Sequence, residues 1–134
     1  MKTVDYRHTG TITSFLQYHF VFCARYRRKI FSMPKVEEQF KQVVNKIAKE
    51  LEIQIIYIEC QVDYAYLFLD CPPTISPSEI MQKIKRETGR ALRETCKELA
   101  SMPNVWTRNY LVSTRSIDSK CINEYVLNQK TRYS

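Results

Sequence analysis

Residues 64–80 read YAYLFLDCPPTISPSEI, and this stretch decides the fold. Side chains alternate between the two faces of a β-strand, so its first eight residues predict a strand with one aliphatic and one aromatic face. The aromatic face carries Tyr64, Tyr66 and Phe68. Pro72 and Pro73 end the strand, because proline has no N–H to donate to a neighbouring strand.

One helix follows this strand directly, and a similar helix precedes it. Ser76 and Glu79 form a capping box with Pro77 at the first helical position, and apolar residues then recur at helical spacing as far as Leu99. Upstream, the segment 34–51 begins with proline and carries an apolar stripe of Val36, Phe40, Val43, Val44, Ile47 and Leu51. Both segments predict amphipathic helices that cover a sheet.

Four further segments complete the pattern. Residues 14–23 (SFLQYHFVFC) and 53–60 (IQIIYIEC) predict two buried strands, and residues 105–114 (VWTRNYLVST) predict a fourth strand. Asp118 can cap a last helix over residues 119–129. The order βαββαβα predicts an α+β, ferredoxin-like or RRM-like sandwich, in which helices cover one face of an antiparallel sheet and a C-terminal helix is added. We expect residues 1–134 to form one domain.

Positive charge is concentrated in two segments. The chain has 21 Lys and Arg against 14 Asp and Glu, a net charge of +7, which favours an anionic partner such as nucleic acid but also occurs in basic proteins without one. The turn after the first strand contains Arg25, Arg27, Arg28 and Lys29 around Tyr26. The second helix carries Lys83, Lys85, Arg86, Arg90 and Arg93, with only two glutamates between residues 83 and 94. We predict that both segments contact phosphates.

The cysteines and the N-terminus indicate the compartment. The five cysteines form no C-x-x-C pair, so we expect reduced core residues rather than disulfides or a zinc site. Residues 1–13 contain no apolar run of signal-peptide length, and no other stretch is long enough to cross a membrane. We therefore expect a cytoplasmic protein with no membrane partner.

Four segments together resemble the small single-tyrosine transposases of bacterial and archaeal insertion sequences. This family is related to the REP-associated tyrosine transposases and to the HUH endonucleases. The matching segments are 18–22 (YHFVF) with 25–29 (RYRRK), 76–80 (SPSEI) with 83–85 (KIK), 105–112 (VWTRNYLV), and 124–126 (EYV) with Gln129. Their order and spacing carry the resemblance more than any one of them.

The resemblance implies a covalent mechanism on DNA. A helix tyrosine, here Tyr125, would attack a phosphodiester, form a 5′-phosphotyrosine link and free a 3′ hydroxyl. In this family an H-x-H pair and a polar residue of the tyrosine helix, here Gln129, hold Mg²⁺ or Mn²⁺ against the phosphate. Tyr125 and Gln129 are four residues apart, so we expect them on one helix face, although an ordinary packing face would show the same spacing.

The metal histidines are missing from this chain. Residues 63–67 read DYAYL where the family pattern is Asp-His-x-His-Leu, so Tyr64 and Tyr66 stand at the positions of the two histidines. A phenol has an ordinary pKa of about 10 and is a poor Mg²⁺ ligand at neutral pH. Metal binding is therefore doubtful, and we predict that cleavage is abolished or very weak. His19 is expected to be a hydrogen-bonded core residue rather than a replacement ligand.

Three functions fit these residues. The first is a transposase, or a close descendant, that binds a single-stranded DNA hairpin as a homodimer with joined sheets, each Tyr125 facing Tyr64 and Tyr66 in cis or from the partner. The second is a catalytically silent, domesticated protein that binds DNA or RNA hairpins as a regulator. The third is an RRM-like RNA binder, which leaves the tyrosine helix unexplained. The aromatic row of residues 64–68 either stacks unpaired bases or packs under the last helix.

Overall fold

The computed structural model describes residues 6–130, which form two sheets and three α-helices joined by short 3₁₀ turns. Residues 1–5 and 131–134, including the beginning of the segment considered for a signal peptide, lie outside the described part. The strands are β1 (Arg7–Thr9), β2 (Ile12–Ser14), β3 (Leu16–Cys23), β4 (Gln54–Cys60), β5 (Tyr64–Cys71) and β6 (Leu111–Ser113). The helices are α1 (Pro34–Leu51), α2 (Pro77–Thr95) and α3 (Ser119–Leu127), and the 3₁₀ turns are η1 (Arg25–Arg27), η2 (Ile30–Ser32) and η3 (Lys97–Leu99).

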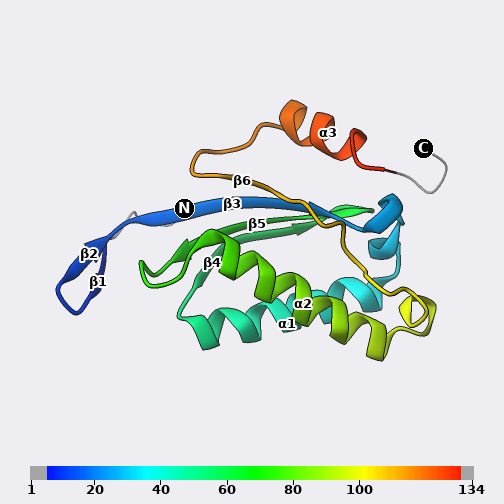
Figure 1. Cartoon of the computed structure of the whole chain (residues 1–134), viewed down its shortest axis with the longest axis horizontal. Coiled ribbons are helices and arrows are strands. Elements are labelled where there is room, and N and C mark those ends of the chain that lie inside the picture. The colour runs from blue at the N-terminus through cyan, green and yellow to red at the C-terminus, as the bar shows by residue number, and fades with distance from the viewer. Residues whose placement is uncertain (1–5, 131–134) are drawn as a thin grey trace.

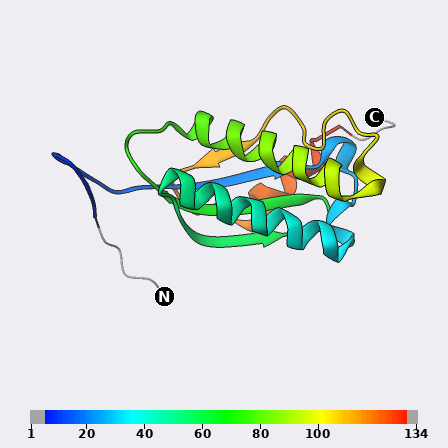
Figure 2. The same ribbon diagram turned by 90° about the horizontal axis from the view of Figure 1, so that it is seen from below.

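The main sheet has four antiparallel strands in the order β4-β5-β3-β6. Its two long strands, β3 and β5, are in the centre and pair over their full lengths, from Leu16 opposite Cys71 to Cys23 opposite Tyr64. Figures 1 and 2 show α1 and α2 side by side on one face of the sheet and α3 on the opposite face. The predicted α+β sandwich with an antiparallel sheet and an added C-terminal helix is confirmed.

The main core lies between the sheet and helices α1 and α2. Phe20 and Phe22 of β3 are fully buried there beside Phe40 of α1 and Ile84 of α2. Trp106 joins this core from a loop, with its ring 4.8 Å from that of Phe22 in an edge-to-face arrangement. Each such buried side chain contributes roughly 1.5–3 kcal/mol of transfer free energy. The core therefore holds the 103–109 segment against α2.

The predicted fourth strand, residues 105–114, was wrong for most of its length. Only Leu111–Ser113 pairs with β3, because the preceding residues bond singly to the end of β3 and to the turn after it. Val105 C=O accepts from the N–H of Arg25 at 2.7 Å, and Thr107 N–H donates to Cys23 C=O at 3.0 Å. Between them, Trp106 turns into the core, where its Nε1–H donates to the buried Thr88 hydroxyl at 3.0 Å. Residues 103–109 therefore form a loop that lies beside α2.

Other boundaries also differ from the prediction. The first strand begins at Leu16, and β1 and β2 form a separate hairpin whose turn uses Gly10 at φ 59°. The second helix ends at Thr95, so Leu99 lies in η3. The last helix ends at Leu127, so Gln129 lies beyond it.

The cysteines were only partly predicted. All five are free, Cys23 and Cys71 are buried, and Cys60 and Cys96 are half-buried, but Cys121 is exposed on the first turn of α3 and is not a core residue. Within residues 6–130, no helix combines the length and the apolar character that crossing a bilayer requires.

Candidate nucleic-acid interface and tyrosine site

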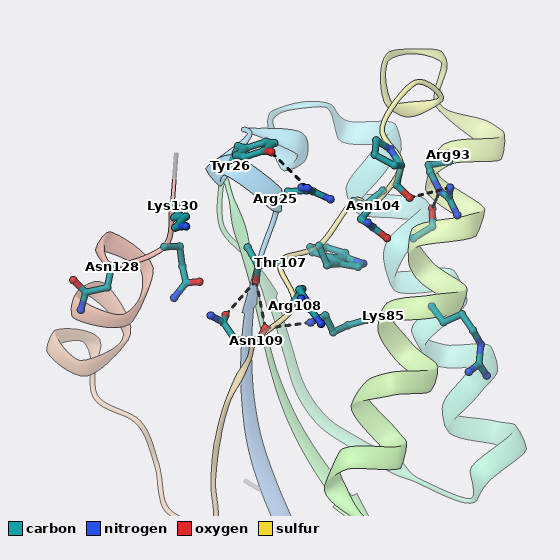
Figure 3. A pocket seen from close by; sticks show the side chains of 16 residues that line it. Arg25, Tyr26, Lys85, Arg93, Asn104, Thr107, Arg108, Asn109, Asn128 and Lys130 are labelled. Atoms are coloured by element: carbon teal, nitrogen blue, oxygen red, sulfur yellow. Dashed lines mark hydrogen bonds between the residues drawn. The ribbon is translucent and has the colours of Figure 1, made fainter. Parts of the chain in front are cut away.

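A basic groove runs between α2, the 103–109 segment, the η1 turn and the residues just after α3 (Figure 3). Its volume is about 1080 Å³, and no acidic residue of the described chain lines it. Six cationic side chains do: Arg25, Lys85, Arg86, Arg93, Arg108 and Lys130. Positive charge without carboxylates, in a hollow of this size, suits a phosphate backbone.

The groove contains four of the nine predicted phosphate-binding residues: Arg25, Lys85, Arg86 and Arg93. Arg28 lines an adjoining hollow of about 330 Å³, which shares Arg25 and Tyr26 with the groove. Lys29 and Arg90 are exposed but lie outside both linings.

Two predicted phosphate contacts are paired with carboxylates instead. Arg27 Nε is 3.5 Å from Asp63, and Lys83 Nζ bridges Glu50 of α1 at 3.3 Å and Glu87 at 3.2 Å. Their charges are therefore largely neutralised, and Lys83 points toward α1 rather than into the groove.

Sequence reasoning missed three residues of the groove. Arg108 and Lys130 add positive charge, and Asn109 connects the groove to the tyrosine helix. The sequence predicts a strand for Arg108 and Asn109, whereas both lie in the loop before β6. Lys130 directly follows the predicted tyrosine helix, and its charge was the one available signal.

Lys85 is a half-buried cation of the groove. Burial lowers the pKa of its ammonium to about 8. The Nζ donates to the backbone carbonyl of Asn109 at 3.1 Å and lies 5.8 Å from the centre of the Tyr110 ring. No carboxylate of the described residues forms an ion pair with it. An anion entering the groove would therefore supply the counter-charge that Lys85 lacks.

The η1 turn at one end of the groove has a strained backbone. Tyr26 and Arg27 both adopt left-handed conformations, with φ of 58° and 54°. Each such residue costs roughly 1–2 kcal/mol when it carries a side chain. The turn is held by the N–H of Ala24, which donates to Asp63 C=O at 2.9 Å, and by the N–H of Arg25.

Tyr125 lies on α3, which packs on the face of the sheet opposite α1 and α2. The helix begins at Asp118, whose carboxylate accepts from the N–H of Cys121 at 2.8 Å. A second apolar cluster joins helix and sheet; we name it the tyrosine cluster. It contains Val21, Cys23, Ile122 and Val126 with Tyr64, Tyr66, Leu111, Ile117 and Tyr125. One chain thus brings Tyr125 into the same cluster as residues 64 and 66.

The hydroxyl of Tyr125 is engaged at the edge of this cluster. It donates to Asn109 Oδ1 at 2.6 Å, and burial raises the pKa of the phenol well above its ordinary value. The proton is thus held by a neutral amide oxygen rather than by a base. Asn109 contacts both Tyr125 and Lys85, so it links the tyrosine cluster to the basic groove.

Gln129 is buried but does not project from α3 beside Tyr125. It follows the C-cap Asn128, and its Nε2 donates back to the carbonyl of Tyr125 at 2.9 Å. The expectation that both side chains share one helical face is therefore wrong, because the helix ends before Gln129.

The side chains at positions 64 and 66 do not form a metal site. Burial raises the pKa of both phenols, so each keeps its proton at neutral pH. Tyr66 shares a hydrogen bond with His19, its hydroxyl 2.6 Å from Nδ1, and the His19 ring stacks on Phe68 at 3.8 Å. Across residues 6–130 there is no grouping of three His, Cys, Asp or Glu that could hold an ion. Two protonated phenols and an amide occupied with a backbone carbonyl do not fit a divalent cation.

The prediction that His19 is a hydrogen-bonded core residue is confirmed, and for Tyr64 and Tyr66 of the aromatic row the structure supports the packing alternative. His19 is 5% exposed and hydrogen-bonded, as expected for a core histidine, and burial lowers its pKa. Tyr64 and Tyr66 pack in the tyrosine cluster beneath α3 rather than forming an open stacking surface.

Comparison with known proteins gives a consistent result. Residues 12–129 match the family described as "Transposase IS200 like". The transposase for insertion sequence element IS200 of Salmonella typhimurium is 28% identical over 116 residues, covering 84% of this chain and 76% of the relative. The ISDra2 transposase TnpA of Deinococcus radiodurans is 23% identical over 118 residues, covering 85% and 84%.

Two solved structures share the fold. A crystal structure from Deinococcus radiodurans, described as a transposase, superimposes with a TM-score of 0.82 at 22% identity, covering 93% of this chain and 98% of the other. A REP-associated tyrosine transposase bound to a REP hairpin gives 0.59 at 12% identity, covering 89% and 68%. The family match spans nearly the whole chain, and the chain therefore belongs to the IS200-like transposase family.

Proposed function

We propose that this transposase-family protein binds a single-stranded DNA hairpin along the basic groove and that its strand cleavage is impaired. The groove itself carries the proposal, since six cationic side chains line it and no described carboxylate does. The structural relative bound to a REP hairpin supports a hairpin as the ligand class. Phosphate contacts of this kind give affinity that falls steeply with salt.

Tyr125 takes the role of nucleophile in this proposal. Its hydroxyl oxygen would bond to phosphorus, the P–O3′ bond would break, the phenolic proton would leave to solvent and the 3′ oxygen would gain a proton. The raised pKa of Tyr125 and its bond to Asn109 oppose this attack. The phenols at positions 64 and 66 cannot supply the charge that would stabilise the transition state. Loss of one such electrostatic group costs on the order of 3 kcal/mol, or ~10² in rate.

One experiment tests binding and cleavage together. The full chain is titrated with a DNA hairpin carrying a single-stranded tail, and the mixture with Mn²⁺ is then run on a denaturing gel. We expect salt-dependent binding and at most a trace of covalent adduct, absent in Tyr125→Phe. The double change Tyr64→His with Tyr66→His should raise adduct formation by about 10²-fold or more. An adduct that survives Tyr125→Phe would disprove the role of Tyr125 as nucleophile. Absence of hairpin binding would disprove the proposal that the basic groove binds DNA.

A second candidate function is a catalytically silent hairpin-binding regulator. The hydrogen bond between Tyr66 and His19 favours this candidate, because it engages the side chain at a position where the family resemblance implies a metal-binding histidine. Under this reading the double histidine change yields no adduct, although the wild type binds hairpins. Binding of single-stranded RNA in preference to DNA would point to the RNA-binding alternative.

We further propose a homodimer with joined sheets. Strands β4 and β6 are the two edges of the main sheet, and Tyr57 on β4 is 50% exposed. Unpaired edge strands offer backbone groups that another sheet can extend. The mass of the monomer calculated from the sequence is 16.0 kDa. Light scattering on the purified chain should give twice this mass. A monomer at micromolar concentration would disprove this assembly.

A further inference from the structure

Tyr26 lines the basic groove and lies outside the apolar core of the described residues. It is 39% exposed and belongs to neither apolar cluster. The Arg25 guanidinium lies 5.1 Å from the centre of the ring, and Arg25 Nη2 is 3.5 Å from its hydroxyl (Figure 3). An aromatic ring that is partly exposed and has a cation at one face can accept another flat group.

The backbone of Tyr26 is costly to the folded state. Its left-handed conformation favours glycine or asparagine, and Arg27 after it is left-handed as well. Such conformations occur at functional sites, where the surrounding structure holds them in place. The described contacts give a tyrosine ring here no packing role that would offset the strain, which indicates a role at the surface.

The surroundings of Tyr26 define the class of ligand. The ring lies between the basic groove and the smaller hollow that contains Arg28, and it lines both. Cationic side chains on either side can hold successive phosphates, which leaves the aromatic face for the base between them. A base in a duplex is already stacked on its neighbours, so only an unpaired base can lie flat on this ring.

We propose that Tyr26, backed by Arg25, is a stacking platform for one unpaired base of the single-stranded DNA in the groove. This rests on the proposed hairpin-binding function and adds to it a preference for an unpaired nucleotide next to the stem. Base stacking on an aromatic ring tolerates any base, so the platform detects strand state rather than sequence.

The test uses the full chain and two DNA hairpins, one with a normal single-stranded tail and one whose tail is abasic. Tyr26→Asn removes the ring and tolerates the left-handed backbone, while Tyr26→Phe keeps the ring. We expect Tyr26→Asn to bind the normal tail about tenfold more weakly, in the range measured for loss of one base stack, and the abasic tail as the wild type does. Tyr26→Phe should match the wild type on both.

A second readout separates stacking from folding. A 2-aminopurine moved through the tail one position at a time should be quenched at one position by the wild type and by Tyr26→Phe but not by Tyr26→Asn. The Tm of Tyr26→Asn should equal or exceed that of the wild type, because a strained residue is relieved. Equal loss of affinity for both tails, or no loss, overturns the platform. A wild type that binds neither hairpin overturns the proposed function as well.

Discussion

The basic groove is open and charged, and no carboxylate of residues 6–130 lines it, whereas the tyrosine cluster beneath α3 is apolar and its tyrosine hydroxyls form neutral hydrogen bonds. Both are formed around the end of β3, and Asn109 touches each of them. The groove has the positive charge that phosphate binding requires, whereas the residues of the tyrosine cluster that the structure describes provide no ligand set for a divalent cation. The contrast teaches that the basic side chains and the tyrosine lie in separate regions of this fold, so a substitution can alter one region and leave the other intact.

Reversing charge in the groove should produce the largest effect and leave the cluster intact. Arg86 and Arg108 are both exposed and carry no described ion pair. Changing both to glutamate should weaken hairpin binding by about 100-fold or more and flatten its salt dependence, because phosphate contacts are lost. Fluorescence anisotropy across a salt series measures both.

The matched control for that experiment lies on α1. Lys46 and Lys49 are exposed there, far from the groove lining, and changing both to glutamate alters the net charge by the same amount. Equal weakening by the two double variants would show that net charge, rather than the groove, governs binding.

A cavity in the tyrosine cluster should lower the stability of the protein and leave hairpin binding unchanged. Ile122 of α3 is buried against the sheet, and Ile122→Ala should lower the free energy of unfolding by about 2–3 kcal/mol, the lower part of the range for such truncations. Hairpin affinity should stay within twofold of wild type. Chemical denaturation and anisotropy measure the two quantities, and a tenfold loss of affinity would show that the two regions are coupled.

The low pKa of Lys85 predicts opposite pH effects on binding and stability. As pH rises through about 8, Lys85 loses its charge in the free protein, so hairpin affinity should fall by about tenfold, the value of one charged hydrogen bond. Because its folded pKa lies below the ordinary value of 10.5, the unfolded state binds more protons between the two pKa values, and Lys85 makes stability rise with pH in that window.

Two substitutions isolate the contribution of Lys85. Lys85→Arg keeps the charge at every accessible pH and should abolish this fall in affinity. Lys85→Met should bind the hairpin weakly already at neutral pH. Its affinity should not fall further as the pH rises through about 8, because position 85 then has no proton to lose. A fall that persists in Lys85→Arg would assign the pH effect to another group.

The smallest expected effect concerns the start of the tyrosine helix. Asp118→Ala removes the cap that accepts from the N–H of Cys121, and should cost about 1 kcal/mol of stability. The first turn of α3 should then show faster amide exchange, while the groove keeps its affinity. Unchanged exchange in this turn would mean that packing alone holds the helix.

The local sequence was sufficient to predict the elements that have a capping motif or a regular apolar pattern. The capping box at Ser76 and the proline at the first position predicted the start of α2, and alternation along residues 64–71 predicted both faces of β5. The same reasoning failed for residues 105–110, where β-branched and aromatic residues favour a strand but Trp106 is drawn into the core. It also failed at Gln129, since one residue of helix more or less decides which way a side chain points.

The sequence by itself determined the layers of this protein and its family, because these depend on residue types at fixed spacing along one chain. Tertiary structure alone decided which charges act together. Arg25, Lys85 and Arg108 come from three segments that meet only after the sheet and α2 have packed, whereas Lys83, two residues before Lys85, turns toward the carboxylate of Glu50 on α1. Helical spacing places neighbours on different faces, but only the element packed against each face determines whether a charge is neutralised or left without a carboxylate partner.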